Sequence, residues 1–208
     1  MKLKLPEGSF RAYLFDCDGT VVDSMPLHYL AWKEALAGWG AIFSEDLFYA
    51  WGGKPPIEIV SALNAMQELK MPVEVVAECK ENFYFDLLPQ LKPVPEVLEV
   101  IELQRGRVPF AVVSGSTRQS VFKSLTTLHL LDRFDVLVGA EDYERGKPAP
   151  DAFLIAASRL GVAPEDCLVF EDTEIGIQAA TAAGMASVRV PSPLERATST
   201  IEPASRLQ

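Results

Sequence analysis

The stretch Tyr13-Leu14-Phe15-Asp16-Cys17-Asp18-Gly19-Thr20 decides the fold of this chain, because an apolar run ends in it abruptly at two carboxylates. A short apolar run closed by a polar turn is typical of a buried β-strand, here from about Arg11 to Phe15. In parallel α/β sheets, ligands bind just beyond the carboxyl ends of the strands. A cation with oxygen ligands, such as Mg²⁺, would offset the repulsion between Asp16 and Asp18 there. For an isolated Asp-x-Asp pair, the alternative is a solvated acidic turn.

Further strand-like segments follow, and they alternate with helical patterns. Strands are expected at 109–113, 136–138, 168–170 and 186–190, and helices at 95–104, 117–128, 151–160 and 175–183. Apolar strands that alternate with helices predict an α/β fold with a Rossmann-like core, in which helices cover both faces of a parallel sheet. The polar segment after Pro191 is expected to be loosely held.

A helical block interrupts this alternation directly after the first strand. Asp23-Ser24 followed by Pro26 is a helix-start signal, and the helical patterns continue to about residue 88 with no strand pattern between them. Prolines then mark the return to the sheet. We therefore predict an α/β core of residues 1–23 and 93–208 and an inserted α-helical cap domain of residues 24–92, which we call the helical insert.

Composition narrows the class of partner. The 208 residues carry a formal net charge of −10 and show no basic stripe, so no nucleic-acid partner is expected. The N-terminus lacks the apolar core of a signal peptide, and no apolar run approaches the roughly 20 residues of a membrane span. Cys17, Cys79 and Cys167 form no zinc or CxxC pattern and are typical of thiols in a reducing compartment. We expect a cytoplasmic, monomeric protein with no membrane partner.

Polar residues also follow three later strands. Ser114-Gly115-Ser116 opens a turn before a helix, where hydroxyl and N–H groups could bind an anion or simply cap the helix. Lys147 lies between a glycine and a proline and could neutralise a phosphoryl group or be an ordinary surface lysine. Glu171-Asp172 would meet the first acidic pair and complete an oxygen-rich cation site, or one of them could cap the next helix.

Together these sites resemble, in order, the four motifs of the haloacid dehalogenase superfamily. They are Asp16-Cys17-Asp18-Gly19-Thr20, Ser114, Lys147 and Glu171-Asp172, and the resemblance covers nearly the whole chain. It implies that Asp16 is the nucleophile that forms an aspartyl-phosphate and that Asp18 is the general acid and base. It also implies that Ser114 and Lys147 hold the phosphate. The metal ligands implied for Mg²⁺ are Asp16, Asp18 through its backbone carbonyl, Glu171 and Asp172. Because the dehalogenase branch typically lacks the second aspartate, the motif favours phosphoryl transfer.

The helical insert resembles the small cap of the β-phosphoglucomutase-like subfamily. Asp23-Ser24-Met25-Pro26-Leu27-His28 looks like that branch, and the resemblance implies that His28, Gly53 and Lys80 contact substrate. The alternative is that His28 and Lys80 are ordinary helix residues. The mutase's phosphate-binding arginine is missing from Gly53-Lys54-Pro55-Pro56, and lysine lacks the planar fork that grips phosphate at two points.

The expected function is that of a Mg²⁺-dependent phosphatase for a small phosphorylated metabolite, a sugar phosphate, bound at Ser114, Gly115 and Ser116. This loop differs from the mutase's alanine-containing version and looks more like that of sugar-phosphate phosphatases. The first alternative is a sugar phosphomutase. The second is a non-catalytic binding protein, which would not need the nucleophile.

Overall fold

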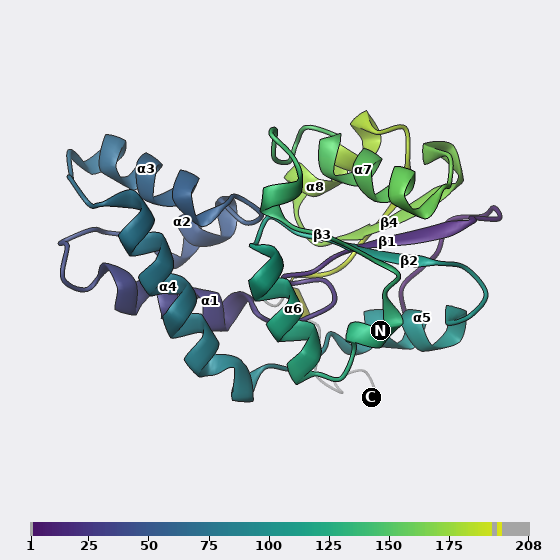
Figure 1. Cartoon of the computed structure of the whole chain (residues 1–208), viewed down its shortest axis with the longest axis horizontal. Helices are drawn as coiled ribbons and strands as arrows, with labels where there is room; N and C mark the ends of the chain where they lie inside the picture. The colour runs from purple at the N-terminus through teal and green to yellow at the C-terminus, as the bar shows by residue number, and fades with distance from the viewer. Residues whose placement is uncertain (1, 193–194, 197–208) are drawn as a thin grey trace, which may run out of the picture.

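Five parallel strands form the centre of the computed structural model, which describes residues 2–192 and 195–196 (Figure 1). They are β1 (Ala12–Asp16), β2 (Phe110–Val113), β3 (Val136–Val138), β4 (Cys167–Glu171) and β5 (Ala186–Arg189). Their order in the sheet is β3-β2-β1-β4-β5, with Tyr13 of β1 opposite Phe110 in β2 and Leu168 in β4. The predicted Rossmann-like parallel sheet is confirmed, and each strand begins and ends within one residue of its expected bounds.

Helices cover both faces of this sheet, as predicted (Figure 1). On one face α5 (Pro95–Gln104) and α6 (Arg118–Thr127) pack against Tyr13 and Phe15 of β1. On the other face α7 (Asp151–Leu160) and α8 (Glu174–Ala182) pack against Leu14. Successive side chains of a strand point to opposite faces, so a strand buried on both faces must be apolar throughout. This is why the apolar run before Asp16 is unbroken.

The helical insert lies at the end of the sheet where β1 finishes (Figure 1). Its helices are α1 (Met25–Leu36), α2 (Glu45–Ala50), α3 (Pro56–Gln67) and α4 (Val73–Leu87). They enclose a hydrophobic cluster of their own, which includes Trp32, Phe43 and Leu63. Leu27 and Tyr84 belong instead to the hydrophobic cluster between the sheet and helices α5 and α6. The insert and the core therefore pack against each other in part.

Short 3₁₀ turns complete the described elements, and the sequence pattern did not predict them. They are η1 (Leu88–Gln90), η2 (Leu131–Arg133), η3 (Ala140–Asp142) and η4 (Pro164–Asp166). The expectation of a loosely held tail falls largely on residues 193–194 and 197–208, which lie outside the described residues. Within the part that the structure describes, no helix has the length and apolar character needed to cross a membrane.

Candidate active site

Four segments that are distant in sequence meet at the carboxyl edge of the sheet. Asp16 ends β1, Ser114 follows β2, Lys147 lies in the loop after β3, and Asp172 follows β4. The Lys147 Nζ donates to Asp16 Oδ1 at 2.5 Å and to Glu171 Oε1 at 2.6 Å. All three side chains are buried, so Lys147 is a member of an internal charge cluster and the surface-lysine alternative is wrong.

Glu171 is held on both of its oxygens by other residues of the site. Oε1 accepts from Lys147, and Oε2 accepts from the Thr173 N–H at 2.5 Å and the Thr173 hydroxyl at 2.9 Å. Helix α8 starts so close by that a β-carbon on Gly176 would lie 1.8 Å from Oε1, so only glycine fits there. Thr173 also caps α8, which rules out the capping alternative for Glu171 and Asp172. Glu171 therefore orients Lys147, and its role as a metal ligand stays a prediction that these bonds disfavour.

The buried charges shift one another's ionisation. Burial raises the pKa of Asp16 well above its usual value, with Lys147 opposing and Glu171 and Asp172 adding to the rise. Burial, with the Glu171 charge adding, also raises the pKa of Asp172 to about 7, although the Thr20 hydroxyl donates to this carboxylate at 3.0 Å. Burial alone would lower the pKa of Lys147, but the charges of Asp16 and Glu171 outweigh it and raise that pKa. Three carboxylates thus share one ammonium group, and an added cation would offset the excess negative charge.

The donor set fits Mg²⁺ better than a metal that needs a cage of side chains. Among the described residues, no group of three or more Asp, Glu, His or Cys side chains could hold a metal ion. Mg²⁺ is commonly bound by one or two carboxylates together with water and substrate phosphate. Asp16 and Asp172, which each direct one oxygen to a protein donor, match this requirement. Asp18 was expected to bind the metal through its backbone carbonyl, and this stays a prediction.

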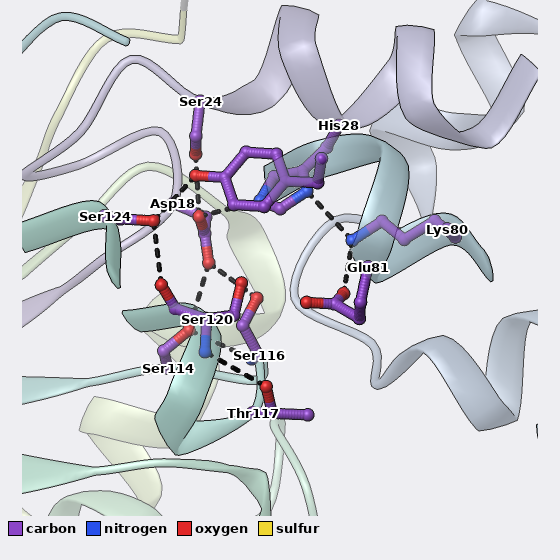
Figure 2. A network of polar contacts seen from close by, with 11 residues as sticks. Asp18, Ser24, His28, Lys80, Glu81, Ser114, Ser116, Thr117, Ser120 and Ser124 are labelled. Carbon is purple, nitrogen blue, oxygen red and sulfur yellow. Dashed lines mark hydrogen bonds and ion pairs between the residues drawn. The ribbon is translucent and has the colours of Figure 1, made fainter. Parts of the chain in front are cut away.

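Asp18 lies at the centre of a second polar network, between the sheet edge and the insert (Figure 2). Its carboxylate accepts hydrogen bonds from Ser24 Oγ at 2.7 Å, His28 Nε2 at 2.9 Å, Ser116 Oγ at 2.8 Å and Ser114 Oγ at 3.1 Å. Burial would raise the pKa of Asp18, but the contacts with His28 and the serine hydroxyls outweigh it and hold that pKa below its usual value. Asp18 is therefore ionised in this arrangement.

The insert contributes a chain of hydrogen-bonded polar side chains to this network. Lys80 Nζ lies 2.9 Å from His28 Nδ1 and 2.7 Å from Glu81 Oε1 (Figure 2). Because an ammonium group can only donate, His28 Nδ1 must accept, and Nε2 carries the proton that reaches Asp18. The structure thus brings His28 and Lys80 to the site, and their contact with substrate stays a prediction.

A partly open cavity of about 50 Å³ lies between the insert and the sheet edge. Its polar lining includes Asp16, Asp18, His28, Gly53, Lys80, Ser114, Gly115 and Ser116, and apolar residues of the insert such as Trp51 and Ile59 form the opposite wall. The loop of the insert rests directly on the core, since a β-carbon on Gly115 would lie 2.3 Å from the Gly53 carbonyl oxygen. A cavity of this size holds a few water molecules and is smaller than a sugar phosphate, so we expect the insert to move when such a molecule binds.

Several residues of the site were not identified from the sequence. Ser24 was predicted to cap the first helix, but it makes no side-chain cap, and its hydroxyl donates to Asp18 instead. Thr20 stood in the quoted motif without a role, and it positions Asp172. Tyr84 of α4 was not singled out from the sequence, and its ring stacks on His28 with 3.8 Å between the ring centroids. Among these, only Thr20 and Ser24 carried a local signal, because Thr20 lies in the first motif and Ser24 lies in the stretch Asp23–His28 that marks the start of the insert.

A parallel sheet with acids at the ends of β1 and β4, hydroxyls after β2 and a lysine after β3 defines a protein of the parallel α/β class whose polar centre is built on carboxylates. The chain belongs to the haloacid dehalogenase-like hydrolase family, whose model matches residues 10–184. It is 37% identical over 182 residues to the fructose-1-phosphate phosphatase YqaB of Escherichia coli (strain K12), covering 87% of this chain and 96% of that protein.

Two further relatives agree with this assignment. The phosphorylated carbohydrates phosphatase of Thermotoga maritima is 32% identical over 178 residues, covering 84% of this chain and 82% of that protein. The crystal structure of β-phosphoglucomutase from Clostridium difficile has a TM-score of 0.80 at 25% identity, covering 90% of this chain and 87% of the other. The resemblance drawn from the motifs is therefore confirmed at the level of family and fold.

Proposed function

We propose that this protein is a Mg²⁺-dependent phosphatase that hydrolyses a small phosphorylated metabolite, a sugar phosphate, through an aspartyl-phosphate on Asp16. The observation that carries the proposal is the buried Asp16–Lys147 ion pair beside a carboxylate, Asp18, surrounded by hydroxyl groups. The names of the relatives support the substrate class, since two of them are phosphatases of fructose 1-phosphate and of phosphorylated carbohydrates.

The reaction would proceed in two halves. The Asp16 carboxylate attacks phosphorus, the bond from phosphorus to the ester oxygen breaks, and that oxygen leaves with a proton from Asp18. Asp18, now ionised, takes a proton from water, which attacks the aspartyl-phosphate and releases inorganic phosphate. The hydrogen bonds from His28 and the serines, which lower the pKa of Asp18, favour the ionised form that the second half requires. In the first half it must carry a proton, so substrate binding has to displace some of its four donors.

Lys147 and the serine loop would bind the phosphoryl oxygens. Lys147 is already fixed by Asp16 and Glu171, so it stabilises charge on the transferring group without having to reorganise. Asp16 and Asp172 would hold Mg²⁺, whose positive charge would stabilise the transferring phosphoryl group. The helical insert would act as a cap that closes over substrate and excludes bulk water.

The mutase alternative is weaker for a structural reason. A mutase must grip a second phosphate in the cap, where an arginine would supply a planar fork. Here Lys54 occupies the loop, and its Nζ lies over the Trp51 ring at 4.9 Å from the centroid. The Lys54 ammonium group, held over an aromatic ring, cannot grip a second phosphate at two points as an arginine would. This favours simple hydrolysis over the mutase reaction. The non-catalytic alternative does not account for a buried nucleophile paired with lysine.

The test is phosphate release from a panel of sugar phosphates and nucleotides with and without Mg²⁺. We expect release from sugar phosphates only when Mg²⁺ is present, and none from Asp16→Asn. Asp86→Asn, an exposed change on α4, is the matched control and should keep full activity. Conversion of β-glucose 1-phosphate to glucose 6-phosphate, primed by the 1,6-bisphosphate with little free phosphate, would instead establish the mutase. Full activity of Asp16→Asn would overturn the nucleophile.

A further inference from the structure

The chain crosses between the core and the helical insert twice, and the two crossings are bonded to each other. Val22 forms an antiparallel bridge with Pro93, and the Asp23 N–H donates to the Lys92 carbonyl at 2.8 Å. Asp23 is thus the last core residue before the insert and lies at the junction of both crossings. The turn that carries Asp18 ends at the same place, because the Gly19 N–H donates to the Val22 carbonyl at 2.8 Å.

A residue from the far end of the chain is bound at this junction. The guanidinium of Arg196 donates to Asp23 Oδ1 at 2.9 Å and to the Pro191 carbonyl at 2.6 Å, with a longer contact of 3.4 Å to the Gly19 carbonyl. The Arg196 side chain is only 15% exposed and that of Asp23 35%, so the pair is partly shielded from solvent. The guanidinium spreads these contacts over two nitrogens, with Nη1 facing the two carbonyls and Nη2 facing Asp23, whereas a lysine would have to reach all three acceptors from one nitrogen.

The local sequence places Arg196 there. Ser192 and Glu195 form a reciprocal capping box, since the Glu195 N–H donates to Ser192 Oγ at 3.3 Å and Glu195 Oε2 accepts from the Ser192 N–H at 2.7 Å. The Arg196 N–H continues this turn to the Ser192 carbonyl at 2.9 Å. Arg189 of β5 lies 3.5 Å from Glu195 and links the turn to the sheet. These bonds fix Ser192, Glu195 and Arg196 relative to one another and place Arg196 beside the Asp18 turn.

We propose that Arg196 is a positioning residue that anchors the Asp18 turn and the crossing at Asp23 to the core, through the Pro191 carbonyl after β5, and so keeps the turn in place while the insert moves. Asp18 must meet substrate, water and four protein donors in one geometry, and it lies on a short turn next to the moving part. Without this anchor, each motion of the insert at Asp23 would be transmitted to the turn. Small misplacements of a catalytic group lower the rate even when binding is intact.

The test combines kinetics with an observation that does not depend on activity, because the kinetic part rests on the proposed phosphatase function. We expect Arg196→Ala to lower kcat about tenfold with KM within twofold of wild type, since a small misplacement has this order of effect on the reacting groups and not on binding. Arg196→Lys should recover only part of kcat. Asp23→Ala should lower kcat to a similar extent, and the double variant should be no worse than either single one. Arg11→Ala removes an exposed arginine paired with Asp166 at 3.6 Å and is the matched control.

Hydrogen exchange supplies the second readout. In Arg196→Ala we expect faster exchange in the peptide that spans residues 17–23 and unchanged exchange in β4, with the melting temperature preserved. Unchanged exchange in residues 17–23, unchanged kcat, or a uniform increase in exchange with a lower melting temperature would each overturn the positioning role. If the wild-type protein hydrolyses no phosphate ester, the proposed function fails, and the exchange result alone decides the role of Arg196.

Discussion

Replacing Gly115 with alanine tests whether close contact between the insert and the core is needed for turnover. The new β-carbon would lie 2.3 Å from the Gly53 carbonyl oxygen, whereas the shortest ordinary carbon–oxygen contact distance is about 3.3 Å. The Gly53 loop must therefore retreat by about 1 Å, and a misplacement of that size can lower the rate about a hundredfold. We expect kcat/KM to fall by a factor between about 10 and 100, equivalent to about 1.4–2.7 kcal/mol of transition-state stabilisation.

The assay is steady-state hydrolysis of the best sugar phosphate in the panel, together with a thermal melt. The melting temperature should change little, because the insert can relieve the clash by moving as a unit. Gly38→Ala is the matched control, since a β-carbon there meets no atom within 4 Å. If Gly115→Ala keeps kcat/KM within threefold of wild type, the contact at Gly53 does not control closure and the reasoning is wrong.

Three other perturbations follow from the site and the insert. Burial holds the pKa of Asp172 at about 7, above its usual value, so in metal-free protein its stabilising contribution is complete below about pH 4 and is lost as the pH rises through 7. Mg²⁺ should therefore raise the melting temperature more at pH 8 than at pH 5.5, and an equal rise at both would contradict this. Lys147→Met leaves Asp16 and Glu171 buried without their ammonium partner, which should remove about 3–5 kcal/mol from the free energy of unfolding in urea and abolish turnover; unchanged stability would refute the buried cluster. Leu63→Ala, inside the cluster of the insert, should lower the free energy of unfolding by about 2–5 kcal/mol, whereas Met66→Ala on the exposed side of α3 should cost little.

The sequence predicts the fold well because its signals are local. Each buried strand is an apolar run closed by polar residues, so β1 and β4 were found to within one residue. The members of the site were likewise recognisable, since Asp16, Ser114 and Lys147 follow strands that must end at one edge of a parallel sheet.

What the sequence could not predict is which partner each polar group takes. Glu171 and Asp172 are adjacent acids, yet one is bound to Lys147 and Thr173 and the other to Thr20. Ser24 carries the signal of a helix cap and instead binds Asp18. These choices depend on contacts between residues far apart in the chain, as with Arg196 and Asp23, and periodicity contains no information about them.

The bonded crossings at Val22 and Pro93 also bear on how such a protein can diversify. Because the chain leaves and re-enters the sheet at one point, the two attachment ends are as close as the ends of a hairpin. A stretch joined in this way can be lengthened, shortened or exchanged for another without altering the strand order or the Asp16–Lys147 pair. The residues of the insert that line the cavity can therefore change while the residues at the sheet edge stay in place.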